Sequence, residues 1–191
     1  ISNKMLKLKM TEGYRYLVLD TFKPTNLESN VTNEYVQLSR DLDTFGRKHD
    51  IGIMCPIQLL SATDKLSYLT ASQITNSKQI KEIASKILLF RKCRNSVELN
   101  PENKSFFLKP YVWTKDPING RYIKKYLRII DSTKPSEKKF EFDRDCIDIS
   151  KRYLVFFIDK NRSGEDSIVY LYQLDGNSGR LMERGICENV S

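Results

Sequence analysis

The chain has 191 residues, of which 40% are hydrophobic and 29% charged, a composition that suits a globular domain with a sizeable core. Its 32 basic and 24 acidic residues give a net charge of +8, which favours a polyanionic partner such as nucleic acid. No apolar run approaches the roughly 18 residues of a membrane span, and no signal peptide is visible, so we expect no membrane partner.

Three short apolar runs in the first half of the chain predict buried strands separated by helices. The runs cover residues 14–20, 51–57 and 86–91, and their β-branched and aromatic content is typical of strands. Apolar residues recur at helical spacing after the first run, at Tyr35, Leu38, Leu42 and Phe45. Residues 70–84 have helical potential before the third run. This alternation is typical of a parallel sheet with right-handed crossovers.

The middle of the chain, from residue 93 to about 150, differs in character. Residues 105–114 and 121–130 flank Asp116-Pro-Ile-Asn-Gly120, and a turn with Pro early and Gly at its end predicts a β-hairpin. The charged stretch 131–145 follows it. Trp113, Tyr111 and Tyr122 in this hairpin offer rings for stacking on bases, but we prefer the interpretation that they form a small satellite core.

A second hairpin is predicted near the C-terminus. Residues 153–158 and 167–172 are apolar and aromatic, and the polar segment Lys160-Asn-Arg-Ser-Gly164 joins them. Lys160 and Arg162 therefore lie at its tip, either as ordinary solvated side chains or as ligands for an anion on a neighbouring molecule. A last short strand is expected at 180–183.

The pattern of cysteines and histidine indicates neither a metal site nor a catalytic site. The four cysteines lie far apart without a CxxC pair, and there is one histidine, so a zinc site or a Cys/His catalytic pair is not expected. We expect reduced thiols and a cytoplasmic location.

Four side chains form a constellation suited to nucleotide hydrolysis. The first apolar run ends in Asp20, and the second ends just before Gln58. Functional groups gather at the carboxyl ends of the strands in α/β sheets. Phosphoryl transfer needs an acid near Mg²⁺, a polar group near the γ-phosphate, and cations such as Lys160 and Arg162.

Four segments together resemble one protein family. Leu17-Val-Leu-Asp20 resembles a Walker B strand, and Ile53-Met-Cys-Pro-Ile-Gln-Leu59 is similar to a strand that ends in a Ser-Gln-Leu sensor. The segment from Ile80 to Phe90 resembles a helix-to-strand passage that reads Ile-Glu-Gln-Asp-Ala-Asp. Phe157-Ile-Asp-Lys-Asn-Arg-Ser-Gly164 resembles a Lys-x-Arg-x-Gly finger hairpin. Their order and spacing resemble the RecA-like ATPase domain of DnaB-type hexameric replicative helicases.

The resemblance implies an α/β fold, the C-terminal portion of a RecA-like three-layer sandwich. The central sheet would be mostly parallel, with an antiparallel C-terminal hairpin and an inserted β-hairpin. Residues 1–92 would belong to the ATPase core, 93–150 to the insertion, 151–184 to the finger hairpin that completes the core, and 185–191 to a tail.

The resemblance also implies the role of each site residue. Asp20 would hold Mg²⁺, Gln58 would sense the γ-phosphate of ATP, and Lys160 and Arg162 would act as an arginine finger on ATP bound to the next subunit of a ring, expected to be a hexamer. Single-stranded DNA would pass through the channel. Candidate DNA contacts are Lys23, Lys65, Thr75, Asn76 and Lys78. The insertion would offer a docking surface for a further partner, a helicase loader or a primase.

Two departures from the family pattern define the alternatives. The phosphate-binding loop G-x-x-x-x-G-K-[ST] is absent from the 191 residues, so we expect a piece of a longer protein that is inactive alone. The family's Arg-Glu-x-Gly motif in its DNA-facing loop is replaced by Thr75, Asn76, Ser77 and Lys78. One alternative is another RecA-like ATPase, such as a recombinase or a KaiC-like or RadA-like protein. The other is a non-catalytic module that binds DNA or a helicase.

Overall fold

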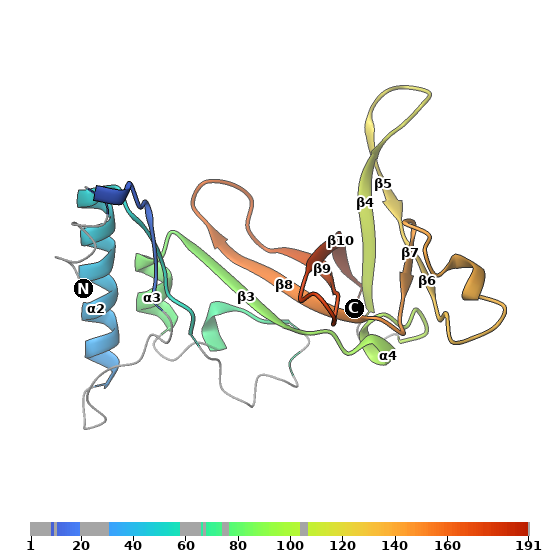
Figure 1. Cartoon of the computed structure of the whole chain (residues 1–191), viewed down its shortest axis with the longest axis horizontal. Helices are drawn as coiled ribbons and strands as arrows, with labels where there is room; N and C mark the ends of the chain where they lie inside the picture. The colour runs from blue at the N-terminus through green and yellow to red at the C-terminus, as the bar shows by residue number, and fades with distance from the viewer. Residues whose placement is uncertain are drawn as a thin grey trace. The chain divides into compact units, whose positions relative to one another are not determined.

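A computed structural model describes residues 9, 11–19, 31–57, 66, 68–73, 77–103 and 107–190. They form two compact units, and Figure 1 traces the elements of each. The first unit comprises the described residues within 1–65 and 70–87. The second comprises those within 66–69 and 88–190.

The first unit contains a parallel strand–helix–strand motif. Strands β1 (Tyr16–Val18) and β2 (Gly52–Met54) pair in parallel, with Tyr16 opposite Gly52 and Val18 opposite Met54. Helix α2 (Val31–His49) connects them, and its last turn contains three basic residues, which the helix dipole favours. The two strands and the helix between them confirm the elements expected from the sequence in this part of the chain.

The second predicted helix is shorter than its apolar pattern indicated. A 3₁₀ turn, η2 (Ala71–Gln73), precedes helix α3 (Ser77–Ile83). Ile80 and Ala71 are buried, at 8% and 1% exposure, so both elements still contribute apolar side chains to the core.

The second unit is built on a six-stranded sheet, whose strand β3 begins at Lys86, two residues before the range of this unit. Its strands follow the spatial order β3-β8-β9-β10-β4-β5. Neighbours from β8 to β5 pair antiparallel. Their bounds are β3 (Lys86–Lys92), β4 (Phe107–Lys115), β5 (Tyr122–Tyr126), β8 (Arg152–Asn161), β9 (Ile168–Leu174) and β10 (Leu181–Val190).

This sheet corrects the expectation of a mostly parallel central sheet. Among the described residues, the only parallel pairs are β1–β2 and a small pair in the second unit, whereas the main sheet is antiparallel. The third apolar run, β3, lies beside β8 rather than beside β2. Its residues alternate between buried and exposed, which is typical of a strand with one covered face and differs from the continuous burial of a central parallel strand.

The two faces of the main sheet differ in burial. Tyr153, Val155 and Phe157 of β8 are at most 1% exposed and form the core with Leu171 of β9. The opposite face carries an aromatic row in which Phe156 lies 4.8 Å from Tyr172 and 5.3 Å from Phe90, measured between ring centroids. Phe90 is 61% exposed, so this second face keeps apolar surface in contact with solvent.

Smaller elements complete the second unit. They are α4 (Asn95–Glu98), the 3₁₀ turn η3 (Lys138–Phe140), and a parallel pair formed by β6 (Arg128–Ile130) and β7 (Cys146–Asp148). Asn95 Nδ2 donates to the carbonyl oxygens of Ile149 and Lys151, at 2.8 and 2.6 Å, and so fixes α4 against the segment that follows β7.

Both predicted hairpins are present. β8 and β9 form the later one, and β4 and β5 form the earlier one, which projects away from the rest of the sheet (Figure 1). The last strand is longer than the expected 180–183. It continues through Val190 past a bulge at Gly185 and pairs with β4. Among the described helices, none is long and apolar enough to cross a membrane.

Candidate functional site

The tip of the β8–β9 hairpin holds the two predicted finger cations. The strands pair in register up to Ile158 and Ile168, and the Ser167 amide closes the loop by donating to the Ile158 carbonyl at 2.6 Å. Asn161 orders the turn internally, since its Nδ2 donates to the Glu165 carbonyl at 3.2 Å and its Oδ1 accepts from the Ser163 amide at 3.3 Å. The tip is thus a hydrogen-bonded turn.

Lys160 and Arg162 occupy different environments at this tip. Lys160 is half-buried near the end of β8, and Arg162 is exposed in the turn. Because side chains alternate along a strand, Lys160 lies on the face of Ile158 and Phe156, whereas Asp159 lies on the core face with Phe157. The structure therefore brings the two cations to one end of the hairpin, as the sequence predicted.

The same hairpin tip also contains carboxylates. Asp159, Glu165 and Asp166 belong to the same tip, so three acids accompany the two cations. Tyr68 packs edge-on against Phe157 with 5.0 Å between ring centroids. Burial, followed by the charges of Asp159 and Asp166, raises the pKa of Tyr68 above its usual value. The tip has no net positive charge, and a bound anion would have to contact Arg162 at its exposed end.

The predicted nucleotide ligands Asp20 and Gln58 lie outside the described residues. The strands that precede them are described, and they are parallel neighbours. The amide of Leu19, directly after β1, donates to the carbonyl of Met54 at the end of β2 at 2.9 Å. The carboxyl ends of the two strands therefore lie at the same edge of their sheet.

The predicted DNA contacts are also mostly outside the described residues. Lys23, Lys65, Thr75 and Asn76 fall in that group. Lys78 lies within helix α3, of which the backbone is described at this position. Their roles stay predictions.

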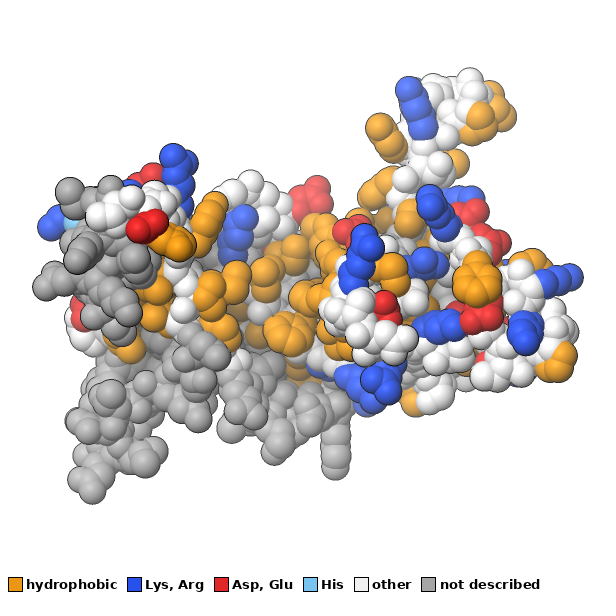
Figure 2. All heavy atoms as spheres, viewed as in Figure 1, with side chains coloured by type: hydrophobic (Ala, Val, Ile, Leu, Met, Phe, Trp, Pro, Cys, Tyr) orange, Lys and Arg blue, Asp and Glu red, His pale blue; other side chains and the backbone are white. Residues whose placement is uncertain are grey.

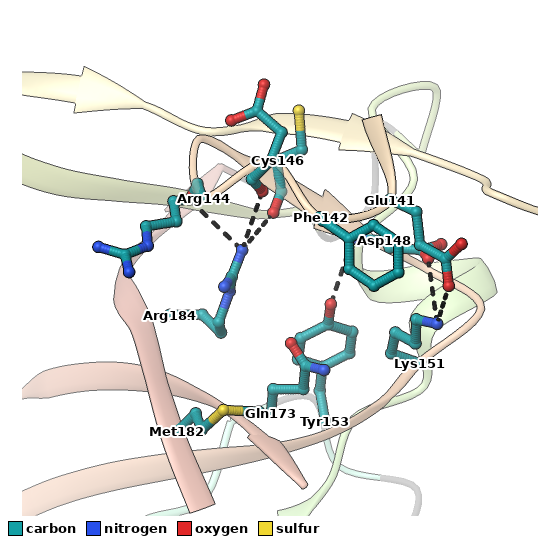
Figure 3. Close-up of a pocket in the computed structure, with 11 residues that line it drawn as sticks. Glu141, Phe142, Arg144, Cys146, Asp148, Lys151, Tyr153, Gln173, Met182 and Arg184 are labelled. Carbon is teal, nitrogen blue, oxygen red and sulfur yellow. Dashed lines mark hydrogen bonds and ion pairs between the residues drawn. The ribbon is translucent and has the colours of Figure 1, made fainter. Parts of the chain in front are cut away.

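The second unit contains a pocket that sequence reasoning did not identify. It has a volume of about 260 Å³ and lies between β7, β8 and the strands that follow (Figure 3). Arg184 Nη2 donates to the Cys146 carbonyl at 2.5 Å on one side. On the other side, Lys151 Nζ bonds Glu141 Oε1 at 2.5 Å and lies 4.0 Å from Asp148 Oδ2.

The positive and negative charges that line this pocket are equal in number. It is lined by three cations and three carboxylates, namely Arg144, Lys151, Arg184, Glu141, Asp143 and Asp148. Burial would raise the pKa of Asp148, but hydrogen bonds from Ser132 and Ser150 outweigh burial and lower it. The hydrogen bond to Glu141 raises the pKa of Lys151. Asp148 and Lys151 therefore stay ionised at neutral pH and connect residues within the 131–151 segment, while Arg184 of β10 connects this segment to the sheet through the Cys146 carbonyl.

Comparison with known proteins does not assign this chain to a family. The chain matches no protein-family model, and no curated protein matches its sequence. Among the described residues, no group of three or more His, Cys, Asp or Glu side chains could hold a metal ion. The predicted Mg²⁺ ligand, Asp20, is not among those residues.

The sequence interpretation did not identify that lysine and aromatic side chains of the β4–β5 hairpin share one face. Tyr111 is buried, as a satellite core requires, but Trp113 and Tyr122 are 51% and 71% exposed, so that interpretation is wrong for both of these residues. The alternation of Lys and aromatic residues at 109, 111, 113 and 115 was the sequence pattern that could have revealed a shared face.

Proposed function

We propose that this chain supplies the C-terminal part of a RecA-like ATPase domain in a DnaB-type hexameric replicative DNA helicase. The observation that carries the proposal is the β8–β9 hairpin, which brings Lys160 and Arg162 to one exposed end of the main sheet. A neighbouring subunit would bind ATP there, and Arg162 would stabilise charge on the transferring phosphoryl group. Such a contribution is worth roughly 10³–10⁵ in rate in related systems.

The parallel β1–α2–β2 motif supports the nucleotide-binding part of the proposal. Its two strands end side by side, and Asp20 and Gln58 follow those ends in the sequence. In this proposal Asp20 holds Mg²⁺ and Gln58 contacts the γ-phosphate of ATP. Hydrolysis then changes the subunit interface, and Lys23, Lys65 and Lys78 contact the backbone phosphates of single-stranded DNA in the channel.

Exposed apolar surface supports a larger parent domain. Tyr16, Val18 and Met54 in the β1–β2 pair are 79%, 59% and 60% exposed, and two-stranded sheets are marginal on their own in water. Leu88 and Phe90 of β3 are similarly exposed on the aromatic face of the main sheet. In a three-layer sandwich such strands would have further strands beside them and helices over both faces.

A complementation experiment tests the proposal. DNA-stimulated ATP hydrolysis is measured for the full-length helicase that the proposal requires, for Arg162→Ala, and for a mixture of Arg162→Ala with a variant whose phosphate-binding-loop lysine is replaced by Ala. We expect both variants to be inactive and the mixture to regain activity, because the mixed interface combines one intact loop with one intact Arg162. The matched control is Arg180→Ala, another exposed hairpin-turn arginine, which should hydrolyse ATP normally.

The antiparallel main sheet favours one alternative, a non-catalytic module that binds DNA or a helicase. The same experiment separates the two functions. If Arg162→Ala hydrolyses ATP at the wild-type rate, the finger role is wrong and the binding module is the better explanation.

A further inference from the structure

One face of the β4–β5 hairpin gathers aromatic and basic side chains from both strands. Lys115 pairs with Tyr122, Trp113 with Lys124, and Tyr111 with Tyr126 across the two strands. Since alternate residues of a strand share a face, a single surface results. We call it the aromatic–lysine face, and its members are Lys109, Tyr111, Trp113, Lys115, Tyr122, Lys124 and Tyr126.

Two exposed rings of this face, those of Trp113 and Tyr126, pack against the buried ring of Tyr111. Tyr111 is 7% exposed and contacts Trp113 and Tyr126 edge-on, with centroid separations of 5.7 and 6.0 Å. Trp113 and Tyr126 remain 51% and 43% exposed, and Tyr122 is 71% exposed nearer the turn. Rings supported in this way lose little further freedom when a flat ligand stacks on them.

The lysines lie among these rings. Lys124 Nζ is 4.7 Å from the Tyr111 centroid and 5.8 Å from that of Trp113, and Lys109 Nζ is 3.7 Å from the Tyr126 centroid. Glu188 of β10 accepts hydrogen bonds from Lys124 Nζ and from the Tyr126 hydroxyl, so one carboxylate also borders the face. That hydrogen bond from Lys124 lowers the pKa of Glu188 and keeps it ionised.

The hairpin as a whole is strongly basic. Residues 107–126 contain five cations and one carboxylate, a net charge of +4, which is half of the net charge of the chain. Figure 2 shows orange and blue side chains together along the projecting hairpin. Exposed aromatic rings interleaved with lysines are the combination by which proteins bind single strands, through stacking of bases and contacts to phosphates.

We propose that the aromatic–lysine face of the β4–β5 hairpin binds single-stranded nucleic acid by stacking unpaired bases on Trp113 and Tyr122. Lys109, Lys115 and Lys124 contact the phosphates. A duplex would match the charge equally well, but its bases are already stacked and offer no free ring face. The proposal does not depend on ATP hydrolysis or on Arg162, and it names residues other than the predicted channel contacts Lys23, Lys65, Thr75, Asn76 and Lys78.

Trp113 is the single tryptophan of the chain, so its fluorescence reports directly on this face. The 191-residue chain is titrated without nucleotide against an oligothymidine of about 16 nucleotides, the upper end of common site sizes. The same titration is repeated with an oligouridine and with a duplex of the same length. We expect either single strand, or both, to quench Trp113 strongly, and the duplex to bind more weakly.

Variants identify the residues, with binding measured by anisotropy of a labelled oligothymidine. Trp113→Ala and Tyr122→Ala should each weaken binding roughly 10- to 100-fold. Phe142→Ala, an equally radical change at a ring that is 91% exposed outside the hairpin, should bind like the wild type. Lys109→Gln and Lys115→Gln should reduce the salt dependence of oligothymidine binding. Lys125 pairs with Asp145 on the opposite face of the hairpin, so Lys125→Gln should change this salt dependence less.

Any of the following results would overturn the proposal. They are binding of duplex as tight as that of single strands, an absence of Trp113 quenching on binding, and equal losses in Phe142→Ala and Trp113→Ala. Far-ultraviolet circular dichroism and thermal unfolding establish that each variant is folded. If only Lys65→Ala and Lys78→Ala weaken single-strand binding, the hairpin proposal fails while the proposed helicase function stands.

Discussion

Arg91 and Glu98 form a bidentate ion pair inside the second unit. Arg91 Nη1 lies 2.8 Å from Glu98 Oε2, and Arg91 Nη2 lies 2.7 Å from Oε1. Glu98 is completely buried and also accepts from the Arg94 amide at 2.9 Å, while the Arg91 guanidinium lies 5.5 Å from the Phe157 ring centroid. The pair joins β3 to α4 and so ties the edge of the main sheet to the segment that leads into β4.

Removing the charge of Glu98 should destabilise the chain strongly. Glu98→Gln leaves Arg91, which is only 8% exposed, without its counter-ion, and breaking a buried pair in this way costs about 3–5 kcal/mol. Urea denaturation followed by circular dichroism measures the loss. Glu102→Gln, the same change at an exposed turn residue, should shift the free energy of unfolding by less than about 0.5 kcal/mol. Equal stability of the two variants would contradict this role of the pair.

The same pair predicts a dependence of stability on acid pH. Burial would raise the pKa of Glu98, but hydrogen bonds from Arg91 and Arg94, together with the charge of Arg91, outweigh burial and lower it below its usual 4.5. A carboxyl group with a lowered pKa stabilises the folded state fully above its unfolded pKa, and this contribution is lost as the pH falls through the folded value. We expect the wild type to lose stability below about pH 4.5 more steeply than Glu98→Gln does.

Gly185 should tolerate no side chain. Its φ is +148°, and a Cβ atom there would lie 2.5 Å from the carbonyl oxygen of Tyr111 in the neighbouring strand β4. Gly185→Ala must therefore displace backbone at the β10 bulge, at a cost of about 1–3 kcal/mol. Gly179→Ala is the control, since its φ is also positive but its Cβ would meet no atom within 4 Å. A thermal shift as small for Gly185→Ala as for Gly179→Ala would contradict the clash.

Local patterns predicted the elements that depend on near neighbours in the sequence. Helix α2 followed from the apolar spacing of its residues, and both hairpins followed from turns placed between aromatic runs. The partner of β3 could not be predicted, because an apolar strand of seven residues fits either a parallel or an antiparallel neighbour. The extension of β10 to Val190 was missed because Gly185, Glu188 and Asn189 have low strand propensity.

The candidate site could be predicted only in part for a similar reason. Hairpin geometry places Lys160 and Arg162 at one tip, and this follows from sequence alone. The aromatic–lysine face depends on the cross-strand register, which pairs Trp113 with Lys124 and becomes known only once the two strands are aligned. The ion pair of Arg91 and Glu98 joins a strand to a four-residue helix, and no helical or strand spacing indicates it.

The hydroxyl of Tyr153 should contribute to stability through a single buried hydrogen bond. It accepts from the Asp148 amide at 3.2 Å, and Tyr153 is 1% exposed. Tyr153→Phe keeps the ring but leaves that amide unsatisfied, which costs about 1–3 kcal/mol. Tyr122→Phe, at an exposed ring, should leave the free energy of unfolding unchanged. Urea denaturation compares the two, and a neutral Tyr153→Phe would show that the hydroxyl is replaceable.

Alkaline pH should destabilise the chain through its buried thiols. Burial, followed by the charge of Glu98, raises the pKa of Cys187 from 9.0 to about 12, and burial also raises that of Cys93. Because the folded pKa lies above the unfolded one, the stabilisation is complete below pH 9 and is lost as the pH rises from 9 towards 12. Under reducing conditions, Cys187→Ala should therefore lose stability less steeply across this range than the wild type. Cys55 is a half-buried thiol in the other unit, so the free energy of unfolding of Cys55→Ala should fall with pH nearly as it does in the wild type. If the free energies of unfolding of Cys187→Ala and the wild type fall in parallel as the pH rises, burial of Cys187 does not have this effect.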